Sequence, residues 1–394
     1  MNRREFLRDG LIAGSLLLTP RFVPAQVSAQ SKKIVVMGAG MAGLVTAYEL
    51  KKLGHNVTVL EAQDRVGGRV LTLRNFSEGH WADAGAARIS RGHDLTHRYI
   101  KEFGLDLMPF YPTTNRFLRV RNNRPDPVEL SQLANSGTAL NGVGRPNEMQ
   151  KITGGNDLLP RAFADRLKQQ IRYSAPVTAV EQDDKEVRIK FTEKGRQQTI
   201  SGDYLVAAVP ATIVRTIQFM PALPQQHLNA LNRADYDSAS RVFIETKSRF
   251  WLEQQLNGFG DGRNGIEMWD STFGEPGTSG ILQTYARGSY STSLTRQTAE
   301  QRIETALGDL EYFHPTIRTQ FVRGTSKCWS EDPWARGAWA YLDGGVALAL
   351  ATPAGRISFC GEHLSLSPGW MQGALQSGLR VVTALSQGRA VSAV

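Results

Sequence analysis

The chain has 394 residues, of which 41% are hydrophobic and 21% are charged, and its formal net charge at pH 7 is +9. This composition is typical of a globular protein, and it excludes a disordered chain and a protein built from membrane spans. The positive charges are dispersed and their short runs contain no stacking aromatic residues, which argues against a nucleic-acid partner and favours a solvated face. They could also attract an anionic substrate to a cleft.

The first 29 residues have the pattern of a secretory leader. A basic start is followed by an apolar run at residues 11–18 and by small residues at 27–29, a pattern that precedes cleavage. The segment "RREFL", with Arg3 and Arg4, resembles the twin-arginine class, which carries folded proteins across the bacterial membrane. We therefore expect export by the twin-arginine machinery to the periplasm or the medium, and the leader (1–29) to lie outside the fold.

Two cysteines and a pair of histidines were considered as metal or redox groups. Cys328 and Cys360 form no CxxC pair, so they signal neither a redox couple nor a zinc site, although one disulfide stays open. His93 and His97 have helical i, i+4 spacing but lack the HExxH pattern. No metal site is expected.

The segment "KKIVVMGAGMAGLVTAYELKKLGHNVTVLEAQ" predicts a strand at 34–37, a glycine turn, a helix at 44–53 and a second strand. Gly38, Gly40 and Gly43 have the GxGxxG spacing that allows a tight turn, the approach of a pyrophosphate and close packing of helix on strand. Glu61 follows the second strand, where a carboxylate can accept hydrogen bonds from ribose hydroxyls. The pattern favours a dinucleotide site over a structural glycine turn, but it does not separate NAD from FAD.

Three further segments carry a resemblance to one family. "EAQDRVGGRV", "ITGGNDLLPRAFADRL" and the C-terminal "GRISFCGEHLSLSPGWMQGALQSGLRVVTAL" resemble the flavin-containing amine oxidases, which include monoamine, polyamine and L-amino-acid oxidases. The resemblance covers nearly the whole chain after the leader and implies FAD as the cofactor. Relatives with covalent flavin have a cysteine where this chain has Ala338, so FAD is expected to be noncovalent.

The resemblance implies an α/β fold with two domains. A Rossmann-like FAD domain is expected from residues 31–93, 174–218 and 345–391, and a substrate-binding domain with a mixed sheet and helices from 94–173 and 219–344. The region 115–150 is shorter than usual, so part of the helical substrate domain is expected to be missing. The implied FAD contacts are Gly38, Gly40, Met41, Ala42, Gly43, Glu61, Ala62, Gly68, Arg69, Gly85, Ala86, Ala87, Arg88, Val177, Gly361, Glu362, Gly369, Trp370, Met371 and Gln372.

Three positions bear on the substrate. Arg88, in "WADAGAARIS", matches the arginine that clamps the substrate carboxylate in L-amino-acid oxidases, a task that suits the two parallel hydrogen bonds of a guanidinium. An arginine that pairs with a nearby acid or contacts FAD phosphate is the alternative. Trp339 and Trp370 match the two walls of an aromatic cage, although a tryptophan is also a common core residue.

The third position departs from the family. Arg241, in "DSASRVFIETKSRFW", stands where most members place a lysine near the flavin, and Lys247 falls off the motif. Arginine is always protonated, so it cannot act as a base, and its presence puts the reaction with oxygen in doubt.

The favoured function is FAD-dependent oxidative deamination of an L-amino acid to a 2-oxo acid, ammonia and hydrogen peroxide. The alternatives are an amine or polyamine oxidase, a dehydrogenase that passes electrons to a quinone or cytochrome, and a noncatalytic flavoprotein. The sequence does not reveal the accepted side chain, and it leaves a homodimer open.

Overall fold

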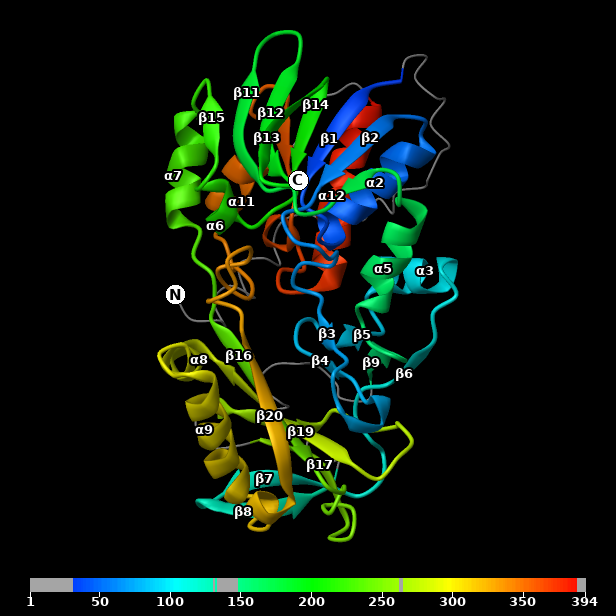
Figure 1. Ribbon diagram of the computed structural model, residues 1–394, viewed down its shortest axis with the longest axis vertical. Coiled ribbons are helices and arrows are strands. Elements are labelled where there is room, and N and C mark those ends of the chain that lie inside the picture. The colour runs from blue at the N-terminus through cyan, green and yellow to red at the C-terminus, as the bar shows by residue number, and fades with distance from the viewer. Residues whose placement is uncertain (1–30, 130–131, 133–147, 262–264, 388–394) are drawn as a thin grey trace, which may run out of the picture.

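The computed structural model describes residues 31–129, 132, 148–261 and 265–387, so the predicted leader lies outside the described residues. Figure 1 shows two lobes, with a parallel sheet at the top and a seven-stranded sheet at the bottom. In the described ranges, no helix combines the length and the apolar character that a membrane crossing needs.

The upper lobe contains a parallel sheet whose order is that of a doubly wound fold. Strand β1 lies inside it and buries four of its five residues, as a parallel strand covered on both faces does. This sheet confirms the predicted Rossmann-like domain. In spatial order its strands are β10 (Ile171–Arg172), β2 (Asn56–Leu60), β1 (Lys33–Met37), β14 (Tyr204–Ala207) and β21 (Ile357–Phe359).

Alternate residues of β1 enter two different cores, one on each face of the sheet. Ile34 and Val36 join the core formed with helices α2 (Met41–Lys52), α3 (Asp94–Glu102), α5 (Leu158–Arg166) and α12 (Met371–Ser386). Val35 and Met37 join the opposite core, which includes residues of α6 (Ala211–Val214), α7 (Gln225–Arg233) and α11 (Gly344–Ala351). Segments from early and late in the described chain meet where α12 packs against α2 (Figure 1).

Part of the segment 94–173 packs on the parallel sheet, whereas we assigned it to the substrate domain. Helix α3 contacts α12, α5 contacts α2, and β10 pairs with β2. The apolar sides of these two helices complete the core beneath α2. An amphipathic pattern shows that a helix covers a core, but not which sheet it covers.

A four-stranded sheet follows the parallel sheet in the upper lobe. The sequence pattern at 176–210 predicts successive strands separated by turns, and the structure has four strands there. Three of them, β11 (Val177–Gln182), β12 (Val187–Glu193) and β13 (Arg196–Gly202), belong to this sheet, and β14 belongs to the parallel sheet. In spatial order, the strands of this sheet are β13, β12, β11 and β15 (Gln218–Met220).

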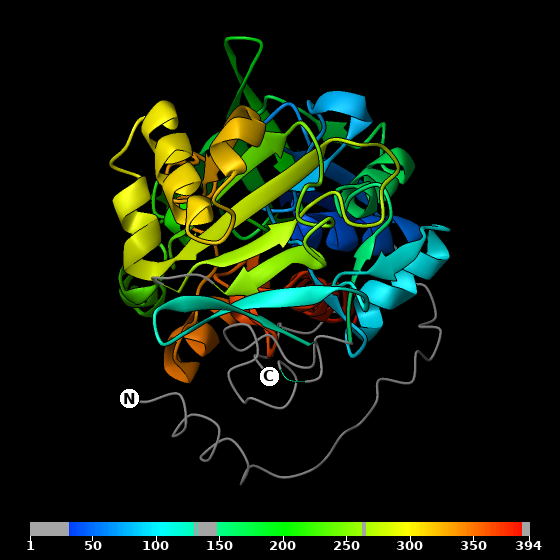
Figure 2. The ribbon, with the colours of Figure 1, turned by 90° about the horizontal axis from the view of Figure 1, so that it is seen from below.

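The lower lobe is built on the seven-stranded sheet, seen from below in Figure 2. Strand β16 buries all eight of its residues: helix α9 covers it together with β20, and Phe243 packs against Ala82 and Ala84. In spatial order the strands are β20 (Phe321–Cys328), β16 (Ala239–Thr246), β19 (Gly280–Arg287), β18 (Glu267–Asp270), β17 (Leu256–Asp261), β7 (Arg116–Arg121) and β8 (Arg124–Val128). The helices are α8 (Gly288–Leu294), α9 (Ala299–Glu311) and α10 (Ile317–Gln320).

Two small sheets lie between the lobes. One pairs β3 (Thr72–Leu73) with β4 (Ala82–Asp83), and the other has the order β5 (Ile89–Ser90), β9 (Met149–Ile152), β6 (Leu107–Pro109). The segment 84–88, which joins β4 to β5, therefore lies between the two lobes.

Candidate functional site

The first glycine turn follows β1, and its glycines meet different surroundings. A Cβ atom at Gly43 would lie 2.0 Å from the main-chain oxygen of Gly38, so α2 could not pack against the turn with any larger residue there. Gly38 has a φ of +100°, which only glycine adopts easily. A Cβ at Gly40 would meet no described atom within 4 Å. Gly40 therefore leaves room for a ligand, whereas Gly38 and Gly43 serve the packing.

Helix α2 begins beside this open space. Gly40 is its N-cap residue, so no side chain caps the helix, and its first turn contains no acidic residue. Its first N–H groups and the positive end of its dipole are thus available to an anion such as a pyrophosphate.

Glu61 follows β2 and faces the same turn. One carboxylate oxygen accepts a hydrogen bond from the N–H of Ala39 at 2.6 Å, and the other accepts from the N–H of Gln63 at 2.9 Å. Burial raises the pKa of Glu61, although these hydrogen bonds oppose the shift. Each oxygen retains a further lone pair, so the fixed carboxylate can still accept from ribose hydroxyls.

A cavity of about 380 Å³ connects the glycine turn with the lower lobe. Its lining comes from both ends of the chain and from the middle. The predicted site residues that line it are Gly38, Gly40, Met41, Ala42, Glu61, Ala62, Gly68, Arg69, Gly85, Ala86, Ala87, Arg88, Val177, Arg241, Trp339, Gly361, Glu362, Gly369, Trp370 and Met371.

Gln372 does not line the cavity, although it belongs to the predicted cofactor contacts. Its side-chain oxygen accepts from the N–H of Thr96 at 3.1 Å and from the Thr96 hydroxyl at 3.2 Å, and its amide nitrogen donates to Asp94. The side chain therefore attaches α12 to α3. Gly43 also stands apart from the cavity, in the contact between α2 and the turn.

Arg69 joins three segments of the cavity wall. Its guanidinium donates to a carboxylate oxygen of Glu362 and to the main-chain oxygen of Ala338, both at 2.8 Å. The second oxygen of Glu362 accepts from the N–H of Gly369 at 2.6 Å. Burial opposes the charge of Arg69, but Glu362 outweighs burial and raises the pKa of Arg69. The pair therefore holds the N-terminal and C-terminal parts of the wall together.

Arg88 is an almost fully buried cation, with 7% of its side chain exposed. It forms an ion pair with Glu267, and the carbon of its guanidinium lies 5.0 Å from the ring centre of Phe110 and 4.8 Å from that of Trp269. Burial opposes its charge, but the Glu267 carboxylate outweighs burial and raises the pKa of Arg88. The other carboxylate oxygen of Glu267 lies 3.0 Å from Arg287. One carboxylate is thus shared by two guanidinium groups.

Arg241 lies on β16 and also lines the cavity. Its guanidinium donates to the main-chain oxygen of Asp83 and faces the rings of Tyr285 and Trp269, at 4.6 and 4.9 Å from the ring centres. Burial lowers the pKa of Arg241, and the charge of Arg88 lowers it further. The Nζ atom of Lys247 instead donates to a main-chain oxygen of α10, at Thr319.

The two predicted cage residues, Trp339 and Trp370, both line the cavity. The Trp370 ring meets the edge of His93 with 4.8 Å between ring centres, and burial lowers the pKa of His93 to about 4. The indole N–H of Trp339 is buried and has no hydrogen-bond partner among the described residues. Both tryptophans are only partly buried, so part of each remains available to a ligand.

Both cysteines are free and buried, and neither lines the cavity. Ala338 does line it.

Three residues that the sequence did not indicate lie in or beside the part of the cavity wall that the seven-stranded sheet forms, which we call the lower wall. Tyr285 and Arg287 line the cavity, and Glu267 does not line it but forms ion pairs with both Arg88 and Arg287. The alternation in "ILQTYARG" indicates a strand with these two side chains on one face. The pairing of that strand with β16, which aligns Tyr285 with Arg241, could not be read from the pattern.

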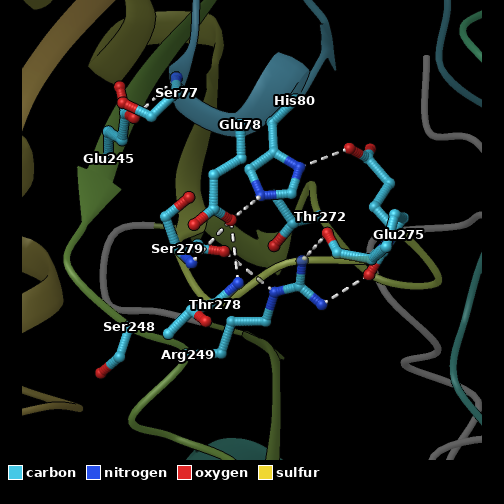
Figure 3. Close-up of polar contacts among 12 residues, drawn as sticks. Ser77, Glu78, His80, Glu245, Ser248, Arg249, Thr272, Glu275, Thr278 and Ser279 are labelled. Carbon is cyan, nitrogen blue, oxygen red and sulfur yellow. Dashed lines mark hydrogen bonds and ion pairs between the residues drawn. The ribbon is translucent and has the colours of Figure 1, made fainter.

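A second polar cluster lies outside the cavity and holds the loop between β18 and β19 (Figure 3). The Nδ1 atom of His80 lies 2.7 Å from a carboxylate oxygen of Glu275, and its Nε2 atom lies 3.4 Å from Glu78. Glu78 also accepts from the N–H groups of Thr278 and Ser279, at 2.8 and 3.2 Å. The cluster fixes the loop whose flanking strands carry Glu267 and Arg287.

The chain is similar to known proteins in both sequence and structure. A family model described as flavin containing amine oxidoreductase matches residues 41–136 and 134–386. The Bacillus subtilis protein YobN, provisionally named an L-amino-acid oxidase, is 29% identical over 90% of this chain and 94% of its own length. The L-amino-acid oxidase of Echis ocellatus is 26% identical over 90% of this chain and 89% of the relative. A putrescine oxidase with three substitutions has a similar structure, with a TM-score of 0.79, 18% identity, and 91% of this chain and 99% of that chain covered.

Proposed function

Because the chain belongs to the flavin-containing amine oxidoreductase family, we propose that it oxidises an L-amino acid with FAD to a 2-oxo acid, ammonia and hydrogen peroxide. Family membership makes it a flavin-dependent oxidoreductase acting on an amine or amino acid. When bound, FAD supplies the acceptor for the hydride that leaves the α-carbon of the substrate. The two electrons and two protons that the amino acid loses reduce oxygen to hydrogen peroxide. Water then hydrolyses the imine product to the 2-oxo acid and ammonia.

The described residues fit FAD. The uncapped start of α2, the space at Gly40 and the fixed carboxylate of Glu61 suit the pyrophosphate and ribose of a dinucleotide. The start of α12 also lines the cavity, at Met371, and its N-cap Trp370 makes no side-chain cap hydrogen bond. A helix N-terminus stabilises negative charge, so α12 would favour the reduced cofactor.

One observation carries the choice of an amino acid over an amine. Arg88 lines the cavity, and the single carboxylate that pairs with it is shared with Arg287. Glu267 alone cannot neutralise both guanidinium groups, and neither it nor the nearby Asp261 lines the cavity, so a ligand meets positive charge at this wall. A substrate carboxylate would compensate that charge, whereas a cationic amine would meet repulsion.

The other wall residues would orient the substrate. Trp339 and Trp370 would frame the α-carbon between aromatic surfaces. The nearby guanidinium groups would lower the pKa of the substrate's amino group, because they disfavour a further positive charge. The neutral amine can then be oxidised without a side-chain base, which agrees with arginine at position 241.

Arg241 favours a second candidate function. A buried guanidinium at this position cannot take up a proton, and it differs in shape from the usual lysine. A dehydrogenase that passes electrons to a quinone or cytochrome would not need the lysine.

We also propose that the protein acts after export by the twin-arginine route, on the basis of the leader pattern alone.

The proposal can be tested on the purified holoenzyme under anaerobic conditions. A panel of L-amino acids and the matching decarboxylated amines is mixed with it, flavin absorbance is followed, and oxygen is then admitted. We expect bleaching by amino acids only, followed by rapid reoxidation and peroxide. Bleaching without reoxidation would indicate the dehydrogenase, and bleaching by amines alone would contradict the amino-acid proposal.

A further inference from the structure

The lower wall of the cavity presents cations from one face of the seven-stranded sheet. Strand β19 is antiparallel to both β16 and β18, and Tyr285 is the direct partner of Arg241 on one side and of Glu267 on the other. Directly paired residues point to the same face of a sheet, and residues two apart on a strand do so as well. Arg287 therefore shares the face of Tyr285 and Arg241, and all three line the cavity.

The carboxylates nearest to these cations do not themselves line the cavity. Glu267, Asp261 and Asp83 do not line the cavity, although each contributes to the charge around Arg88, Arg241 or Arg287. Burial raises the pKa of Asp261 and that of Asp83 to about 6, so both carry less than a full charge near that pH. A ligand in the cavity thus meets guanidinium groups before it meets any of these carboxylates.

The acidic residues that do line the cavity belong to other segments and have donors of their own. Glu61 accepts two main-chain hydrogen bonds, Glu362 pairs with Arg69, and Asp332 pairs with Lys327 at 2.6 Å. They leave the charges of the lower wall uncompensated.

Arg88 and Arg287 differ in freedom. Arg88 is held by Glu267 and by the rings of Phe110 and Trp269, and only 7% of its side chain is exposed. Arg287 binds the same carboxylate at its other oxygen and keeps 24% of its side chain exposed. Its guanidinium carbon lies 5.3 Å from the ring centre of Tyr285. Arg287 is thus the more accessible of the two cations.

An α-carboxylate needs one guanidinium, and the wall provides more than one. We propose that Arg287 binds a carboxylate on the substrate's side chain, so that the preferred substrates are L-amino acids with an acidic side chain. This inference rests on the proposed function, in which Arg88 binds the α-carboxylate. A neutral side chain would leave Arg287 uncompensated beside Arg88.

The first test compares amino acids of equal shape and different charge. Anaerobic flavin reduction of the holoenzyme is measured with L-glutamate against L-glutamine, L-aspartate against L-asparagine, and with L-leucine and L-phenylalanine. We expect at least one acidic amino acid to exceed its amide by about tenfold or more in the ratio of reduction rate to Kd. Equal values, or a preference for leucine or phenylalanine, would overturn the inference while leaving amino-acid oxidation intact. Reduction by amines alone would instead contradict the proposed function.

The second test assigns the preference to Arg287 and does not require turnover. Binding of glutarate and succinate to the holoenzyme is measured by calorimetry, with butyrate as the monocarboxylate. In Arg287→Met, we expect two ratios to fall to about one: the affinity for a dicarboxylate over that for the monocarboxylate, and the ratio of reduction rate to Kd for an acidic amino acid over that for its amide. Arg287→Lys keeps the positive charge but lacks the paired N–H donors of a guanidinium, so both ratios should stay partly above one. This second variant keeps the test decisive if Arg287→Met fails to fold. Arg196→Met, on exposed β13, is the matched control and should leave both ratios unchanged. Unchanged ratios in both Arg287 variants would overturn the assignment.

Discussion

Replacing Arg88 with methionine separates its two roles, ion pairing and substrate binding. Removing one partner of a buried ion pair costs about 3–5 kcal/mol, because it leaves the other charge uncompensated. Here Glu267 is 1% exposed, but Arg287 still lies 3.0 Å away, so we expect the lower end, about 3 kcal/mol. An unfolding entropy of about 2 cal/mol/K per residue gives about 0.8 kcal/mol/K for a chain of this length, so the Tm should fall by about 4 °C.

The double variant Arg88→Met/Glu267→Gln removes the stranded carboxylate as well. We expect it to recover at least half of the lost Tm, since neutralising both partners is far less costly than removing one. It should not recover substrate binding, because charge-assisted hydrogen bonds to the α-carboxylate stay absent. Their loss, about 1.5–3 kcal/mol, corresponds to a Kd roughly 10- to 150-fold higher.

Thermal unfolding followed by flavin fluorescence gives the Tm, and anaerobic reduction by an L-amino acid gives the Kd. Arg302→Met is a matched control, because Arg302 is also a largely buried arginine in an ion pair, with Glu331, and does not line the cavity. It should lower the Tm without changing the Kd. If the double variant regained both stability and a normal Kd, Arg88 would be a structural residue and the amino-acid proposal would lose its support.

Three further changes test other parts of the site. Gly43→Ala should lower the Tm even of the protein without FAD, since its Cβ would lie 2.0 Å from the main-chain oxygen of Gly38. Gly40→Ala should fold normally but retain less FAD, which the ratio of flavin to protein absorbance measures. Arg241→Lys should speed reoxidation of the reduced enzyme by oxygen by about tenfold or more, measured by stopped flow, and an unchanged rate would contradict the role given to this position. Asp83 has a pKa raised to about 6 by burial, so its contribution to stability is complete below about pH 4 and is lost as the pH rises through 6. Asp83→Asn should therefore raise the free energy of unfolding by up to about 3 kcal/mol at pH 8 and by about half of that at pH 5, as urea titrations would show.

The parts of the site that lie within short segments were predictable from sequence. The strand, turn and helix around Gly38, Gly40 and Gly43, and Glu61 after the second strand, follow from local spacing, because one βαβ unit creates that geometry by itself. The aromatic and glycine residues near the C-terminus followed from the family resemblance.

The charged wall was not predictable in the same way. Arg88, Glu267 and Arg287 come from three elements, and their contact depends on the pairing of β18 with β19 and on the placement of the segment after β4. No local pattern specifies that register. The same reason explains why the sequence did not show that α3 and α5, within the segment 94–173, pack on the parallel sheet: a sequence pattern shows an apolar face, but not the surface that it covers.

The order of strands in the parallel sheet has a consequence for synthesis. Its members lie between residues 33 and 359, and α12, which packs on α2, ends at residue 386. Translation at about 5–20 residues per second separates the appearance of β1 from that of β21 by roughly 15 s or more. Throughout that interval β1 and α2 lack the C-terminal partner that closes the cavity. The site is therefore complete only after β21 and α12 have been synthesised, and a chain that stops before β21 would have no complete site in which to hold a cofactor.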